Sequence, residues 1–179
     1  MAEAFSNKLT RAAGIVTTSS SGAVGITSTI ITGISTVGVA VSDLVVNANF
    51  IAGTKVTELG ADSVTVDRTS TNTTASSSQS VSFLGPTTAY TSAAATKSVL
   101  IGGTFANNTD NSVNLTVEVR DQSTAVSVAI ASKIPVPAGS SFVISDTGKT
   151  VLESGDEIRI YCDSNDAIDA SLSVLTGVN

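Results

Sequence analysis

The chain has 179 residues, a formal net charge of −6 and no histidine. Only 13% of its residues are charged and 4% are aromatic, whereas 41% are hydrophobic. This balance disfavours nucleic-acid binding, since no basic stripe exists to neutralise phosphates, and it disfavours binding to anionic membranes. The core must be built from Val, Ile, Leu and Ala, β-branched or small residues that suit pleated sheets, and the strand and turn patterns below predict an all-β protein.

Residues 1–13 differ from the rest of the chain. Phe5, Leu9 and either Ala12 or Ala13 fall at helical spacing, which predicts a short helix or an extended arm. A segment this short is marginal as an isolated helix. Two interpretations follow: a frayed terminus, or an N-terminal arm that docks on a neighbouring subunit. The acidic Glu3 stands where a secretory signal would carry basic residues, so we expect no signal peptide.

Residues 14–84 are predicted to form a small β-barrel-like module of short strands. A hairpin is the clearest part, because Val56 on one strand and Val64 and Val66 on the next alternate with polar residues across a Gly-containing turn. The polar segment 69–80 is predicted to be a flexible linker or a polar strand on an exposed edge. The candidate strands are 14–18, 24–32, 44–46, 55–59 and 63–68.

Residues 85–179 are predicted to form an antiparallel β-sandwich of the immunoglobulin-like or jelly-roll-like kind. Short strands recur here with turn signals every 8 to 12 residues, which is typical of a sandwich. The turn signals lie at 137–139, 146–148 and 154–156. The candidate strands are 87–91, 97–106, 112–121, 126–134, 141–145, 149–153, 157–163 and 167–176.

The most regular pattern lies in residues 97–121. Val113, Leu115, Val117 and Val119 occupy alternate positions, so one face of that strand is apolar. The strand before it, 97–105, carries a matching apolar face, and the polar turn 107–111 joins the two. This arrangement predicts a β-hairpin that organises the second unit.

The sequence offers little chemistry. Without histidine, a Ser-His-Asp or Cys-His catalytic device is impossible. The single cysteine, Cys162, alternates with Ile158 and Ile160 and is predicted to be a small buried hydrophobe. We therefore assign no catalytic residue, no cofactor-binding residue and no metal ligand.

Two patterns contain residue types found in binding or catalytic sites. Asp163, Asp166 and Asp169 offer oxygen ligands for a calcium ion or a carboxylate pair for a hydrolase, but the loop lacks the Gly and the distant Glu of an EF-hand and reads better as a solvated turn. Gly102 and Gly103 lack the sequence context of a phosphate-binding loop, so a bulge or close packing within a strand explains them better.

Several motifs of the second unit, in this order, resemble a domain found in virion proteins of tailed bacteriophages, especially marine cyanophages. They are an opening Thr-x-Tyr-Thr, a strand ending in Ala-Asn, a Pro-Ala-Gly-Ser-Ser turn, a Leu-Glu-x-Gly-Asp turn and a final strand, at residues 88–91, 97–107, 137–141, 152–156 and 170–175. The first unit resembles small β modules of the same proteins through residues 51–57 and 63–66.

The resemblance implies a non-enzymatic virion structural protein, made in the host cytoplasm and placed at the head, neck or tail of the particle or on the capsid surface. It implies other virion proteins as partners, and a homo-oligomer or many copies. Low charge and a Ser/Thr-rich surface suit such assembly. We expect the N-terminal part to dock and the sandwich to be exposed. The alternative is a tail-fibre or surface adhesin module whose polar loops, 107–111 and 163–166, bind host glycan.

Overall fold

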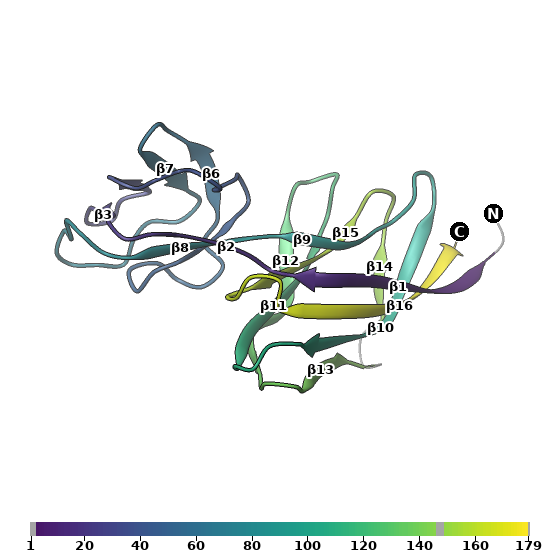
Figure 1. Ribbon diagram of the computed structural model, residues 1–179. Coiled ribbons are helices and arrows are strands. Elements are labelled where there is room, and N and C mark those ends of the chain that lie inside the picture. The colour runs from purple at the N-terminus through teal and green to yellow at the C-terminus, as the bar shows by residue number, and fades with distance from the viewer. Residues whose placement is uncertain (1–2, 146–148, 179) are drawn as a thin grey trace. The chain divides into compact units, whose positions relative to one another are not determined.

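The computed structural model describes residues 3–145 and 149–178, so the turn predicted at 146–148 lies outside the described residues. The described chain folds into the strands β1 to β16, all paired antiparallel, and contains no helix within those ranges (Figure 1). The predicted all-β class is therefore confirmed.

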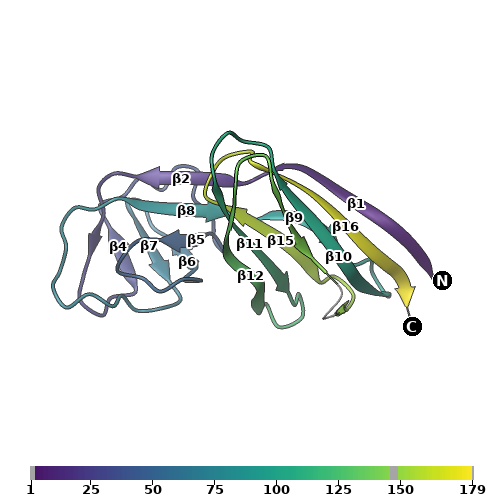
Figure 2. The ribbon, with the colours of Figure 1, turned by 90° about the horizontal axis from the view of Figure 1, so that it is seen from below.

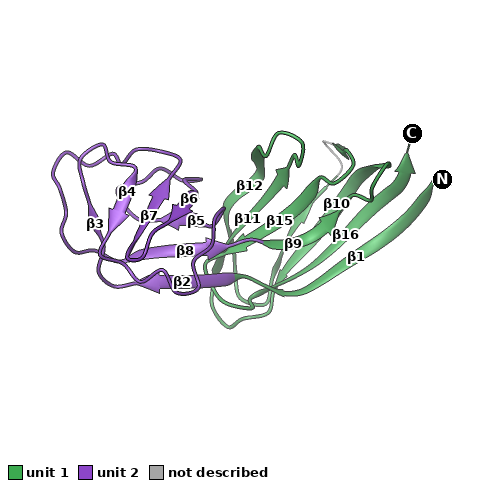
Figure 3. Cartoon of the chain, turned by 90° about the horizontal axis from the view of Figure 1, so that it is seen from above, with its two compact units in different colours: residues 1–14, 87–179 green, residues 15–86 purple. Residues whose placement is uncertain are grey.

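Two compact units divide the chain, and Figure 3 colours them separately. Unit 1 comprises residues 1–14 and 87–179, and unit 2 comprises residues 15–86. Unit 2 is thus an insertion in unit 1, entered after Gly14 and left after Pro86. The predicted boundaries differ from these because residues 1–13 are not a separate arm, and because Gly85 is the last residue of a unit 2 strand.

Unit 1 is a sandwich of two antiparallel sheets. The first, here called the β1 sheet, has the order β1-β16-β10-β13, with β14 also paired to β10. The second, here called the β12 sheet, has the order β12-β11-β15-β9. The strands of the β1 sheet are β1 (Ala4–Ala13), β16 (Ile168–Val178), β10 (Lys97–Asn107), β13 (Ser141–Ile144) and β14 (Thr150–Leu152), and those of the β12 sheet are β12 (Ser127–Val136), β11 (Val113–Arg120), β15 (Glu157–Cys162) and β9 (Thr87–Thr91).

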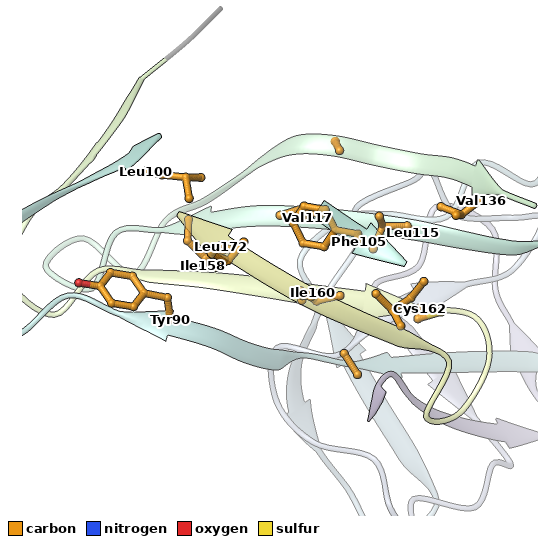
Figure 4. Close-up of a cluster of buried hydrophobic side chains, with 14 of the residues drawn as sticks. Tyr90, Leu100, Phe105, Leu115, Val117, Val136, Ile158, Ile160, Cys162 and Leu172 are labelled. Atoms are coloured by element: carbon orange, nitrogen blue, oxygen red, sulfur yellow. The ribbon is translucent and has the colours of Figure 1, made fainter. Parts of the chain in front are cut away.

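The core of unit 1 fills the space between these two sheets. Phe105 and Leu172 of the β1 sheet pack with Leu115, Val117 and Ile160 of the β12 sheet, and all five are fully buried (Figure 4). Large aliphatic side chains dominate, as the composition requires. Burial of each such side chain stabilises the fold by roughly 1.5–3 kcal/mol.

The predicted hairpin of residues 97–121 is wrong. The strands themselves are present, as β10 and β11, but β10 pairs with β13, β14 and β16, whereas β11 pairs with β12 and β15. Each strand turns an apolar face to the core from a different sheet. The alternation of residues specifies one buried face, but it does not specify which strand lies beside it.

Residues 4–13 form the strand β1, which excludes a helix over that segment. The strand pairs with β16, with Phe5 opposite Leu175 and Leu9 opposite Ser171. Phe5 and Leu9 are four residues apart, and this spacing places two side chains on one face of a strand as well as of a helix. The sequence pattern was therefore ambiguous, and pairing with the last strand of the same chain decides it.

Unit 2 holds two small sheets and no closed barrel among its residues, so the barrel-like prediction is corrected. One sheet has the order β2-β8-β5 and the other β3-β4-β7-β6. The predicted strand 24–32 is split by a turn in which Thr27 has φ 46°. The strands are β2 (Ile15–Ser19), β3 (Ala23–Val24), β4 (Ile30–Thr32), β5 (Leu44–Val46), β6 (Val56–Leu59), β7 (Ser63–Val66) and β8 (Val81–Gly85).

The predicted hairpin at 56–66 is confirmed, with Val56 paired to Val66 and Leu59 to Val64. The polar segment 69–80 is neither a linker between units nor a regular edge strand. It runs within unit 2, where the buried hydroxyl of Ser70 donates to Gly25 O at 2.7 Å and accepts from Ser28 N at 3.0 Å. The core of unit 2 gathers Val24, Ile31, Val45, Val64 and Phe83 with six other apolar residues.

Candidate functional site

The polar loop 107–111 lies at one end of unit 1, beside the start of β16, since Asn108 N donates to Ala167 O at 3.0 Å. Asn107 is 3% exposed. Its Nδ2 donates to Asn111 O at 2.7 Å and to Val136 O at 2.9 Å, while its Oδ1 accepts from Thr109 N and Oγ1. The side chain that headed the predicted glycan loop therefore holds the loop together and is not free to bind a ligand.

Asp163, Asp166 and Asp169, the candidate calcium ligands or carboxylate pair, do not converge on one site. The Asp163 carboxylate accepts from Asn114 N at 2.8 Å and from Asn114 Nδ2 at 2.6 Å. Asp169 Oδ1 accepts from Ala12 N at 2.8 Å, and Asp166 occupies a left-handed position with φ 52°. Over residues 3–145 and 149–178, no group of three or more Cys, Asp or Glu side chains is arranged to hold a metal ion.

Cys162 lies on the core-facing side of β15 and is completely buried. Burial raises the pKa of its thiol, which disfavours the thiolate that a nucleophile requires. The pair Gly102 and Gly103 coincides with a bulge in β10, because the register against β16 shifts between Leu100 and Gly102. A Cβ added to Gly103 would lie 2.7 Å from Leu172 Cδ2, so close packing explains that glycine.

Four polar side chains, those of Tyr161, Glu118, Arg159 and Glu157, lie on the face of the β12 sheet opposite to the core, and the first two are buried. Tyr161 Oη donates to Glu118 Oε1 at 2.8 Å, and Arg159 forms an ion pair with Glu157 at 2.7 Å. Burial, reinforced by the Glu118 carboxylate, raises the pKa of Tyr161 far above its ordinary value. Tyr161 is therefore a neutral hydrogen-bond donor at physiological pH, and the group acts as a fixed network across β11 and β15.

An open groove in unit 2 has a volume of about 420 Å³ and runs along β3 and β4. Its walls are apolar or carry hydroxyls, and none of its lining residues titrates. A catalytic role would need at least one convergent acid–base or charged group, and the lining of this groove offers none. The lining residues are Ala23, Val24, Gly25, Ser28, Ile30, Thr32, Ala75, Ser76 and Ser77.

The outer face of the β1 sheet carries an apolar row that is exposed at its two ends and partly exposed between them. Phe5 lies opposite Leu175, Leu175 opposite Val99, and Val99 opposite Val151, so four strands each contribute one side chain. Phe5 is 78% exposed and Val151 is 55% exposed. We call these four residues the outer row. Figure 2 shows β1, β16 and β10 side by side in the sheet that displays it.

A second line of cross-strand neighbours crosses the same face, from Leu9 through Ser171 and Thr104 to Val143. It contains no charge, and its two apolar ends are 78% and 53% exposed. The sequence reasoning missed this face. The sequence shows the alternation of apolar and polar residues within each strand. The apolar rows across the sheet, however, depend on the pairing registers between strands that are distant in the chain.

Comparisons with known proteins add little to this geometry. No protein-family model matches the chain, and no curated protein matches it. Among solved structures, a chain in the structure of infectious bursal disease virus, Gx strain, aligns with a TM-score of 0.31 and 12% identity. The alignment covers 92% of this chain and 33% of that chain. A score this low does not establish a shared fold. Within the described ranges, no helix could cross a membrane.

Proposed function

We propose that this chain is a non-enzymatic structural component of a virus particle that assembles with other virion proteins and with copies of itself. The outer row is the observation that carries this proposal. Large contiguous apolar patches on a protein surface mark contacts with other proteins, and the outer row places four apolar side chains next to one another across four strands. The low charge of the whole chain reinforces the argument, because a surface of Ser, Thr and Asn costs little to desolvate on assembly.

In its finer form the proposal follows the resemblance to tailed-phage virion proteins. The chain would be an accessory protein of the head–neck–tail region or of the capsid surface, made in the host cytoplasm and located in the virion. One expectation changes with the structure. Residues 4–13 belong to the sandwich itself, so docking through them brings the β1 sheet to the contact and leaves the β12 sheet and unit 2 for other roles.

The glycan-binding alternative gains no support from the geometry. Asn107 and Asp163 are engaged in internal hydrogen bonds. Sugar sites usually stack a ring on an exposed aromatic side chain, but Tyr90 and Tyr161 are buried. The exposed Phe5 lies opposite Leu175, near the end of β16, whereas the loop 107–111 lies beside the start of that strand. Among the polar side chains of the loop 107–111, Asn108, Asp110 and Asn111 are the exposed ones that such a site would have to use.

The test is mass spectrometry of particles purified by density gradient from hosts infected with the virus that encodes this chain. We expect the protein to co-purify with the particles in many copies. Val151→Lys should lower its incorporation, because it places a charge in the outer row. Val37→Lys, at an 83% exposed position of unit 2, is the matched control and should be incorporated normally. Recovery of the wild-type protein only in the particle-free fraction would overturn the proposal.

A further inference from the structure

The β1 strand is one of the two long edges of the sandwich; β1 and β12 have 10 residues each. Within the described ranges it pairs on one side only, with β16, along Ala4–Thr10, and Figure 3 shows it at the margin of unit 1. In an antiparallel ladder, alternate residues turn their N–H and C=O groups away from the paired neighbour. These free groups form a template for another strand, and proteins usually protect such an edge.

The other long edge is protected. β12 pairs with β11 through two register shifts, and it carries Lys133 at φ 51° and Pro135. Bulges, lysine and proline all oppose the addition of a further strand. In contrast, β1 keeps a regular register from Ala4 to Thr10 and shifts only before Ala13. Its end, where Ala12 has φ 55°, is where pairing would stop.

The exposed side chains of β1 are complementary to those of a second, antiparallel β1. Residues at odd positions share the outer face. If Asn7 lies on a two-fold axis, Phe5 of one copy faces Leu9 of the other, and Glu3 faces Arg11. Each of these contacts occurs twice, as a two-fold interface requires. Cross-strand apolar pairs and opposite charges both stabilise an antiparallel sheet.

In the single copy, the exposure of these side chains and their lack of ion-pair partners among the described residues agree with that arrangement. Phe5 and Leu9 are each 78% exposed in the single copy. Neither Glu3 nor Arg11 forms an ion pair with any of the described residues. Even-numbered side chains point the other way, since Lys8 Nζ lies 6.0 Å from the centroid of the Tyr90 ring and Thr10 Oγ1 donates to Ala89 O. On the outer face of β1, Asn7 Oδ1 accepts a hydrogen bond from Ser173 Oγ at 3.3 Å, while Phe5 and Leu9 remain available for a partner.

We infer that two copies of this chain join antiparallel through their β1 strands, with Asn7 at the two-fold axis. The joined sheets would run without a break from β13 of one copy to β13 of the other. The outer row of one copy would then continue through Phe5 into Leu9 of the next. The inference rests on the proposed function in that it supplies the contact by which an assembly component joins its neighbour.

Disulfide trapping tests the strand and its register in the purified full-length protein. Asn7→Cys brings two thiols face to face, because directly opposed residues of an antiparallel pair have Cα atoms about 4.5–5.5 Å apart, within disulfide reach. Val128→Cys, 62% exposed on the edge strand β12, is the matched control. Cys162 is fully buried and does not compete. We expect a covalent dimer from the first variant only.

Substitutions that reverse or introduce a charge on β1 test the same register without a crosslink. Glu3→Arg places arginine opposite arginine twice, and Leu9→Lys places an ammonium opposite Phe5 twice. Each should weaken dimerisation about tenfold or more, measured by sedimentation equilibrium as loss of the species of twice 17.9 kDa. The swap Glu3→Arg with Arg11→Glu should restore it. These positions are exposed, so far-UV circular dichroism should show an unchanged fold.

Three results would overturn the inference: a wild-type chain and an Asn7→Cys variant that both stay monomeric, crosslinking through Val128→Cys instead, or a charge swap that fails to restore what Glu3→Arg weakens. The proposed function fails separately. A chain absent from particles but crosslinked at Asn7→Cys would refute the virion role alone, whereas a chain present in particles but monomeric and uncrosslinked would refute the β1 contact alone.

Discussion

Asn107→Ala should destabilise unit 1 by about 2–4 kcal/mol, because its buried amide fixes the loop that connects β10 of one sheet to β11 of the other. The substitution removes two short donor bonds, to Asn111 O and Val136 O, and two acceptor bonds from Thr109. A net hydrogen bond contributes about 1 kcal/mol, and a buried carbonyl left unsatisfied costs about 1–3 kcal/mol. Relaxation of the exposed end of the loop brings the total below the simple sum.

The assay is urea denaturation followed by far-UV circular dichroism at pH 7, with the midpoint and the slope fitted for each variant. Asn108→Ala is the matched control, because Asn108 is the next residue, is exposed, and uses only its backbone N–H in the contact with Ala167 O. We expect the control to change stability by less than about 0.5 kcal/mol. An Asn107→Ala variant as stable as the control would refute the claim that Asn107 fixes the loop between β10 and β11.

Three further predictions concern stability. Gly103→Ala should cost about 1–3 kcal/mol in the same denaturation assay, because its Cβ would meet the fully buried Leu172, whereas the exposed Thr104→Ala should cost little. Burial raises the pKa of Asp43, so its contribution to stability is full below about pH 4 and is lost as pH rises through its folded pKa; Asp43→Asn should therefore gain stability over wild type at pH 7 and not at pH 3.5. Tyr161→Phe removes the hydrogen-bond donor to the buried Glu118 carboxylate and should lower the free energy of unfolding by about 1.5–3 kcal/mol. If Glu118→Ala lowers the urea midpoint by that much while Tyr161→Phe leaves it unchanged, the result would count against this account.

Strand positions followed well from the sequence. The residues of β5 and β9 agree with the predicted ranges, and the 56–66 hairpin formed as expected. Local alternation and turn residues determine these features, and both are visible in a single chain. Cys162 likewise proved buried, since it shares the alternation of Ile158 and Ile160.

Strand partners did not follow. β10 and β11 are neighbours in sequence but lie in different sheets, and β1 pairs with the last strand of the chain. Alternation gives each strand a buried face, yet it holds no information on which of the other apolar faces completes the layer. The outer row escaped prediction for the same reason, because Phe5, Leu175, Val99 and Val151 meet only through three long-range registers.

The most direct measurement of the central claim is a cryo-electron microscopy map of purified particles that traces the strands of this chain. We predict many copies per particle, with β1 of each copy paired to β1 of a neighbour and Phe5 packed on Leu9 across the two-fold axis. Particles that lack the chain, or that carry it with β1 facing solvent in every copy, would contradict the claim.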